Sequence, residues 1–512
     1  MSVPLIWTAH EYRFSAFYRL AGMWGLYFFL LLLMQFPISA SNKRSIIGVV
    51  VTASLIQAAI ASWQIIAPIS AAKWTGYSYQ LAQGRPLGML MQVNLLGVFL
   101  GTGMLGALWL ALTSHDPKLK PLNWLPILIL SAGVILTESR TAWLGAAIGI
   151  ACLCWIYRGE RKTRYLIMVL LAGAGAGQSM LAMRDPNLGL MATVSPVHAG
   201  AMQSGDRRPM MVNERFKWNR QHSEEERRTM IIGSLEMIGH SPLTGFGLGS
   251  FESQFPQILA LEGIVNPFTT TVTHPHNELL YVWCEGGIIA MFGLLLCLGA
   301  LGAPLLAWKN PATVAKGVLM IPLLTHSMTE YPFYLSITHA VVLLILFWVA
   351  QPARGIEEQQ ESRGSSVLRR GGMVLCVAVA LFMLSGLQSA LRMFQLEHGE
   401  FKHAELLANL SNRWGLADRL EFDSAVADLM QFNKLRDPIL LRDFQKNADD
   451  WLSRHNDADL ITSMIQVVRF FHEPGYGYWN RRGCLSFPQD PRFKCLSPTS
   501  AITKRYSDEN KK

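Results

Sequence analysis

The sequence predicts an all-α, polytopic helical membrane protein. Of its 512 residues, 51% are hydrophobic and only 16% are charged, which disfavours a soluble fold. Apolar runs long enough to cross a ~30 Å hydrocarbon core also recur along most of the chain. We therefore expect about ten transmembrane helices, one large loop on the outer side and a helical domain after the last span.

Ten apolar segments are candidates for the membrane spans. They comprise residues 17–36, 46–68, 87–112, 122–137, 141–157, 165–183, 277–307, 313–328, 335–351 and 371–391. The segments 122–137 and 313–328 are short, so buried helices or re-entrant segments are the alternative for those two. No cleavable signal peptide is expected, because the opening residues lack a basic region followed by a short apolar core.

Basic residues between the spans predict the orientation of the chain. The loop at residues 157–165 is rich in Arg and Lys, so the positive-inside rule places it in the cytoplasm. The other basic loops then also fall inside, and the net charge of +9 reflects topology rather than a nucleic-acid partner. The same count puts the N-terminus outside, which two missing helices or a misread first span would explain.

Four regions follow from this topology. We expect transmembrane helices at 1–183, a large outer loop at 184–276 whose end carries the active site, further transmembrane helices at 277–391, and an outer helical domain with a disordered end at 392–512.

Three local signals refine the two outer regions. In the loop, a helix is expected from Glu224 with Ser223 as its N-cap, followed by a glycine-rich turn at 245–249. In the tail, Asp437 and Pro438 have the pattern of an N-cap and first helical residue. Cys484 and Cys495 would face an oxidising compartment and are expected to form a disulfide.

Ionisable side chains gather at the outer ends of the predicted spans, where each is a functional candidate because charge is costly near a membrane. Taken one at a time, each residue also has an explanation without function. An arginine there can extend to the lipid headgroups, a histidine can be an ordinary hydrogen-bonding residue, and His326 and Glu330, at i, i+4, can pair with each other. Together they suit an anionic ligand, because guanidinium binds phosphate and histidine accepts a proton near neutral pH. The six residues are Arg85, Arg140, His274, His276, His326 and Glu330.

A metal site is less favoured, and no metal or cofactor is expected. His274 and His276 lie at i, i+2 without an acidic triad, although Glu278 and Glu285 are close enough in sequence to leave the possibility open.

Four motifs resemble a known family. The stretch HNELLYVWCEGG is similar to the His-Asn signature of the O-antigen ligase and Wzy superfamily, with Gly287 as its later glycine. RPLGMLMQVN resembles a segment of the bacterial O-oligosaccharyltransferases, with Leu87 and Val93 as departures. HSMTEYPFY and ESRTAW are similar to two further motifs of that protein-glycosylating (PglL-type) branch, which also carries an outer C-terminal helical domain.

The resemblance implies a glycosyltransferase of the bacterial inner membrane with its active site facing the periplasm. Such enzymes move a glycan from undecaprenyl diphosphate to Ser or Thr of exported proteins such as pilin, without ATP or a nucleotide sugar. An O-antigen ligase or polymerase with the same donor and a sugar acceptor is the alternative. A flippase is disfavoured, because the polar residues lie on one face rather than through the membrane depth.

The resemblance also implies roles for particular residues. His276 would accept the proton of the acceptor hydroxyl, and Arg85 and Arg140 would bind the diphosphate. An arginine of the outer loop would add a third phosphate contact, with Arg207, Arg208, Arg215 and Arg220 as candidates. Substrate-binding or orienting roles are expected for Asn277, His274, Gln92, Asn94, His326 and Glu330.

Overall fold

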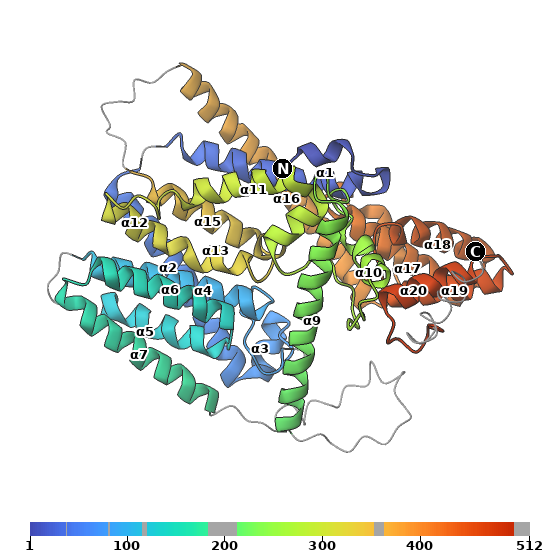
Figure 1. Cartoon of the computed structure of the whole chain (residues 1–512), viewed down its shortest axis with the longest axis horizontal. Coiled ribbons are helices and arrows are strands. Elements are labelled where there is room, and N and C mark those ends of the chain that lie inside the picture. The colour runs from blue at the N-terminus through green and yellow to red at the C-terminus, as the bar shows by residue number, and fades with distance from the viewer. Residues whose placement is uncertain (37, 80–81, 115–119, 183–211, 353–362, 496–512) are drawn as a thin grey trace.

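The computed structural model describes residues 1–36, 38–79, 82–114, 120–182, 212–352 and 363–495, and within those ranges it contains helices and no strand. Figure 1 shows the apolar helices lying side by side, α9 crossing one end of this bundle, and α17 to α20 packed beyond that end. The structure confirms the prediction of an all-α, polytopic fold.

Six helices in the described ranges have the length and apolar composition to cross a membrane. They are α1 (His10–Leu33), α2 (Ala40–Ile66), α4 (Val93–Leu112), α7 (Arg161–Ala182), α11 (Glu278–Gly302) and α16 (Arg363–His398). Three further apolar helices are shorter, namely α5 (Pro121–Leu136), α6 (Arg140–Ile156) and α15 (Ile337–Ala350). A single long or shorter apolar helix therefore lies at nine of the ten predicted spans, and the tenth is divided into short pieces.

The predicted span at 313–328 is divided into three short pieces. They are α12 (Pro311–Gly317), the 3₁₀ turn η2 (Val318–Met320) and α13 (Ile321–Ser327). Pro322 contributes no N–H to the helical ladder, which explains a change of hydrogen-bonding pattern at this point. The segment is thus a broken helix rather than a single regular span.

Helix α4 lies in the interior of the bundle, and almost all of its side chains are buried. Small residues allow its neighbours to approach closely. A Cβ atom added at Gly103 would lie 2.2 Å from the Oγ of Ser54 in α2, and one added at Gly97 would lie 2.8 Å from the Cβ of Ala142 in α6. This packing fixes the ends of α4 and α6 relative to each other.

The two ends of the bundle differ in chemistry. At one end, Lys43 donates to the carbonyl of Gln351, Arg44 donates to Thr113 Oγ1 at 2.6 Å, and Lys162 donates to the carbonyl of Ser114. The basic loops that the positive-inside rule groups together therefore meet at this end. At the opposite end, the N–H of Leu248 donates to Thr8 Oγ1 at 3.0 Å, so the N-terminal segment lies beside the large loop.

Helix α11 is interrupted at Gly287, whose φ of 64° and ψ of −167° break the helical ladder. The freed carbonyls of residues 284 and 285 accept the N–H groups of Phe246 and Gly247, both at 2.9 Å. A Cβ atom at residue 287 would lie 2.2 Å from the carbonyl oxygen of Leu243. The motif glycine is therefore required so that the predicted glycine-rich turn can dock against α11.

The helix expected to begin at Glu224 begins earlier. Helix α9 spans Val212–His240, so Ser223 lies inside it and is not an N-cap. The residues before Ser223 have no regular apolar pattern, and helical propensity alone did not reveal this extension. Helix α10 (Phe251–Leu261) follows and packs against α9 through Phe255 and Gly233.

The chain after α16 forms a small helical domain with its own apolar core. Its helices are α17 (Ala417–Leu435), α18 (Pro438–Leu452), α19 (Ala458–Phe470) and α20 (Tyr476–Ser486). Asp437 caps α18 by accepting the N–H of Ile439 at 2.9 Å, as predicted. Shorter elements elsewhere are η1 (Val3–Ile6), α3 (Pro68–Thr75), α14 (Pro332–Leu335), η4 (Ala404–Asn409) and η5 (Trp414–Leu416).

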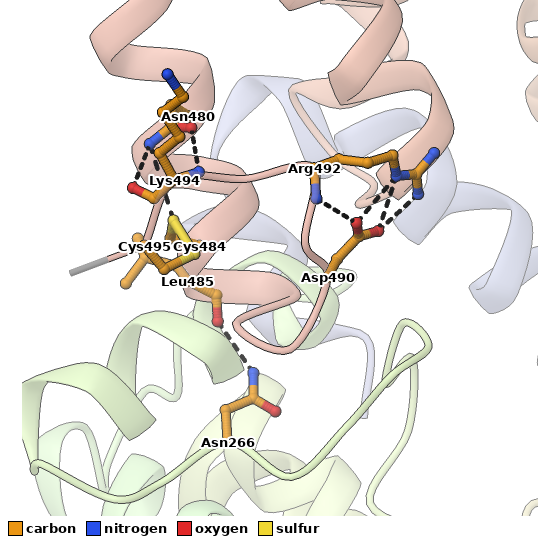
Figure 2. Close-up of a disulfide and its surroundings, with 8 residues drawn as sticks. All are labelled: Asn266, Asn480, Cys484, Leu485, Asp490, Arg492, Lys494 and Cys495. Carbon is orange, nitrogen blue, oxygen red and sulfur yellow. Dashed lines mark hydrogen bonds and ion pairs between the residues drawn. A yellow bond between two sulfur atoms is a disulfide. The ribbon is translucent and has the colours of Figure 1, made fainter. Parts of the chain in front are cut away.

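The predicted disulfide between Cys484 and Cys495 is confirmed (Figure 2). It joins α20 to the loop that follows, with a sequence separation of 11 residues. A cross-link closing a loop of this size stabilises a fold by about 3 kcal/mol in the chain-entropy model. It therefore holds this loop in a small domain whose core is limited.

Candidate active site

His276 and Glu330 form a hydrogen-bonded pair at the end of the bundle where the large loop lies. The Nδ1 atom of His276 is 2.6 Å from Oε2 of Glu330. An ionised carboxylate can only accept, so Nδ1 carries the proton and Nε2 of the neutral ring keeps its lone pair. The Glu330 side chain is 7% exposed and that of His276 is 35% exposed, so the imidazole is the open member of the pair.

A directed chain of hydrogen bonds continues behind Glu330. The ionised carboxylate of Glu330 can only accept, so the amide nitrogen of Asn94 donates to Glu330 Oε1 at 3.2 Å. Asn94 Oδ1 then accepts from Ser139 Oγ at 2.7 Å, and Ser139 Oγ accepts the N–H of Ala142 at 3.3 Å. The direction of each bond is set, and the chain orders Glu330 so that its other oxygen faces His276.

The backbone of His276 is in the left-handed region, with φ of 54°. This conformation is uncommon for a non-glycine residue and persists only where the surroundings hold it. Its N–H donates to Nδ1 of His274 at 2.9 Å. The His274 ring, which is 4% exposed, stacks on Tyr331 with ring centroids 4.5 Å apart. Burial lowers the pKa of His274, so its ring stays neutral and Nδ1 remains able to accept.

Asn277 ties the two halves of the pair together. Its Oδ1 caps α11 by accepting the N–H of Leu280 at 3.1 Å, and its Nδ2 donates to the carbonyl of Met328 at 3.0 Å, two residues before Glu330. Both polar atoms of the side chain are thus used within the protein. These two bonds position the loop of His276, and a substrate-binding role for Asn277 stays a prediction.

Three helices begin around the pair, which affects the charge of the site. The N-caps are Gln92 for α4, Ser139 for α6 and Asn277 for α11. Hydrogen bonds from Asn94, Ser139 and Asn277 bring these three N-termini to the segment around Glu330. Free N–H groups and the positive end of the helix dipole at each N-terminus favour an anion nearby.

Arginines add full positive charges to this region. Arg140 is the first residue of α6, it is exposed, and among the described residues it has no hydrogen bond or ion pair. Both of its neighbours touch the site, because Ser139 bonds Asn94 and Thr141 accepts from Thr329 Oγ1 at 3.2 Å. Its guanidinium is therefore free to bind a ligand beside the pair.

Arg227 of α9 is a residue that the sequence did not single out. Burial alone would raise the pKa of Glu330. The hydrogen bond and charge of His276, with the charges of His326 and Arg227, outweigh burial, so the pKa is lowered overall. The charge of Arg227 therefore acts on Glu330, and the side chain is exposed. Arg227 could have been assigned to the site only by knowing that α9 crosses this end of the bundle.

The remaining predicted residues lie in different settings. Arg85 is half-buried, and among the described residues its guanidinium reaches Gln83 only, at 3.5 Å. Its segment is held by Gln64, whose Oε1 accepts the N–H of Leu87 at 2.9 Å. The buried Oε1 of Gln92 has no partner among the described residues. The structure places Arg85 in the loop before α4, and among the described residues it makes no hydrogen bond to the chain behind Glu330.

His326 is fully buried behind Glu330, and both of its ring nitrogens lack a partner among the described residues. It cannot touch a substrate in this conformation. Arg207 and Arg208 lie outside the described residues, as do the side chains of Arg215 and Arg220. Within the described ranges there is no group of three or more residues that could hold a metal ion.

The arrangement joins a proton acceptor to an anion-binding region. His276 Nε2 can accept a proton, and Glu330 can stabilise the imidazolium that results. Arg140, Arg227 and the helix N-termini can hold and neutralise a phosphate group. These are the parts required to deprotonate a hydroxyl next to an anionic leaving group.

Two family models match the chain in separate segments. The O-antigen ligase family matches residues 125–295, which include Arg140, Arg227 and His276. The family described as virulence factor membrane-bound polymerase, C-terminal, matches residues 315–435, which include Glu330. No individual curated protein matches the sequence. Over these two segments the chain is similar to membrane-bound O-antigen ligases and polymerases, which supports a place in the O-antigen ligase and Wzy superfamily and glycan transfer of that kind.

Proposed function

We propose that this protein is an O-oligosaccharyltransferase of the bacterial inner membrane. It moves a glycan en bloc from undecaprenyl diphosphate to Ser or Thr of exported proteins such as pilin. Residues 184–276 and 392–512 face the periplasm in this proposal. The observation that carries it is the His276–Glu330 pair, in which Nδ1 of the partly exposed imidazole faces the carboxylate and Nε2 is left to accept a proton. Arg140, whose guanidinium has no partner among the described residues, begins α6 at the same end of the bundle.

The reaction follows from these groups. The acceptor hydroxyl oxygen attacks the anomeric carbon of the glycan, its proton passes to Nε2 of His276, and the bond from the anomeric carbon to the diphosphate oxygen breaks. The products are the glycosylated hydroxyl and undecaprenyl diphosphate. Arg140 and Arg227 bind the diphosphate and stabilise the negative charge that it gains on leaving. The imidazolium later returns its proton to water.

Arg140→Ala is expected to weaken binding of undecaprenyl diphosphate about 10- to 100-fold, because hydrogen bonds to charged groups contribute about 1.5–3 kcal/mol. Titration of the purified protein with undecaprenyl diphosphate measures this change. The matched control is Arg158→Ala, another exposed arginine, which lies at the opposite, basic end of the bundle. Equal affinities for the parent and the Arg140 variant would remove this residue from the donor site.

The acceptor distinguishes this function from that of an O-antigen ligase or polymerase, which the match to residues 125–295 also supports. The helical domain at the end of the chain favours a protein acceptor, because it packs against the loop that leads to His276 and adds a folded surface there. Mass spectrometry of exported proteins and of lipopolysaccharide from a deletion strain tests the choice. Loss of protein glycans with unchanged lipopolysaccharide supports the proposal, whereas altered lipopolysaccharide with unchanged protein glycans contradicts it.

A further inference from the structure

We propose that the C-terminal helical domain positions the loop that carries His276, and that Glu252 and Asn266 are the residues through which it acts. The inference rests on the proposed function in one respect, because it takes His276 as the base. The loop at 262–277 joins α10 to α11 and ends in the strained backbone of His276. Strained conformations need outside support, and this loop receives it from the turn after α18 and from α20.

Glu252, in the first turn of α10, makes the first connection. Its Oε1 accepts the N–H of Asn456 at 2.7 Å and its Oε2 lies 3.0 Å from Nδ1 of His455. Its backbone carbonyl also accepts from the side chain of Asn456 at 2.8 Å. The Glu252 carboxylate is 11% exposed, so these bonds are formed away from bulk water, where they are stronger.

The turn that contains His455 and Asn456 is also bound by Arg482, on the side opposite Glu252 in the hydrogen-bond network. The guanidinium of Arg482, on α20, donates to the carbonyl of His455 at 2.9 Å and to Asn456 Oδ1 at 3.3 Å. The turn after α18 is therefore clamped between α20 and Glu252. This turn also contacts the loop directly: the hydroxyl of Thr271 donates to the carbonyl of Asn456.

Asn266 makes the second connection. Its Nδ2 donates to the carbonyls of Leu485 at 3.0 Å and Ser486 at 3.3 Å, and its Oδ1 accepts the N–H of Phe268 at 3.0 Å. Figure 2 shows Asn266 pointing from the loop to the end of α20, next to the disulfide. Asn266 as a whole is 9% exposed, so an amide lost here would leave largely buried carbonyls without a donor.

These contacts hold the loop along the ten residues that precede His276. Gln489 adds a bond to the carbonyl of Pro267 at 3.3 Å, and the ring of Phe268 is buried against α10 and α11. Beyond Thr271 the chain has only a few residues before it reaches His274 and His276. A shift at Asn266 or Thr271 would therefore be passed on to the imidazole, and a displacement of about 1 Å can lower a catalytic rate about 100-fold.

The experiment compares Glu252→Ala and Asn266→Ala with two matched controls in the full-length protein. Gln257→Ala changes an exposed residue of α10 whose amide bonds within its own helix at 2.9 Å. Thr270→Ala changes an exposed residue of the same loop next to Thr271. Glu252→Gln is the conservative variant, because its amide oxygen can still accept from Asn456.

Two measurements are made on each protein. One is hydrogen exchange of residues 262–277, read by mass spectrometry. The other is the kcat and donor KM of glycan transfer from a lipid-linked disaccharide on undecaprenyl diphosphate. We expect faster exchange and a kcat about 10- to 100-fold lower in the two test variants, with the donor KM changed less than about twofold. The controls and Glu252→Gln should stay close to the parent.

Each outcome decides the matter. Parental exchange in Glu252→Ala and Asn266→Ala overturns the clamp whether or not the protein transfers glycans, so the test stands apart from the proposed function. Faster exchange with a parental kcat shows that the contacts stabilise the loop without positioning the base, and also overturns the proposal. An equal loss of kcat in the controls does the same. If Glu252→Ala does not fold, Asn266→Ala and Thr271→Val carry the comparison.

Discussion

Replacing His276 by alanine is expected to lower the rate of glycan transfer about 100- to 10,000-fold, the range typical for loss of a general base. Binding of undecaprenyl diphosphate should change less than about threefold. The reason is that the imidazole accepts a proton only as the hydroxyl attacks, so its contribution belongs to the transition state and appears in kcat rather than in donor affinity.

The control for this variant is His240→Ala. His240 is another partly exposed histidine hydrogen-bonded to a glutamate, with Nε2 2.8 Å from Oε1 of Glu262, at the end of α9. The two variants remove the same chemical group, and only one removes it from the candidate site. A His276→Ala protein that binds donor and transfers at more than about a tenth of the parental rate would exclude His276 as the base.

Glu330→Gln is expected to lower kcat by a similar factor, about 100- to 10,000-fold, although it changes a single atom. Asn94 donates to the oxygen on its side of residue 330, so the new amide would place its oxygen toward Asn94 and its NH₂ toward His276. That NH₂ group would donate to Nδ1 and move the ring proton to Nε2. The atom that must accept the proton of the hydroxyl would then already carry one.

A second substitution should restore part of this loss. In the double variant Asn94→Asp with Glu330→Gln, the carboxylate at position 94 accepts both from Ser139 and from the new amide. The amide then turns its oxygen to His276, and Nδ1 again carries the proton. We expect kcat to rise at least about 10-fold over the single Glu330→Gln variant. If the double variant is slower than the single one, the directed chain does not control the ring proton.

The sequence predicts much of this architecture because its strongest signals are local. Apolar runs locate the spans, and an Asp-Pro pair locates the start of α18. The pairing of His276 with Glu330 was not predicted as a contact. The i, i+4 spacing offered a local His326–Glu330 pair as one alternative, and Glu330 was otherwise expected to orient neighbouring residues. In the structure the carboxylate of Glu330 is hydrogen-bonded to His276, and His326 is buried.

Other features depend on contacts between distant segments, and no local pattern encodes them. The charge of Arg227 acts on Glu330 only because α9 crosses the end of the bundle, and the direction of the Asn94 amide is set by Glu330 and Ser139, 236 and 45 residues away. The connections through Glu252 and Asn266 span 204 and 219 residues of sequence. A single sequence shows the residue types at these positions but does not show which of them meet.

In the proposed reaction, His276 deprotonates a protein hydroxyl that attacks a lipid-linked glycan. The most direct test reconstitutes the purified protein in liposomes with a lipid-linked disaccharide on undecaprenyl diphosphate, an exported acceptor protein, and no nucleotide. We expect one undecaprenyl diphosphate released for each glycan found on a Ser or Thr by mass spectrometry, with both products lost in His276→Ala. Equal glycosylation by the parent and the variant would contradict the account.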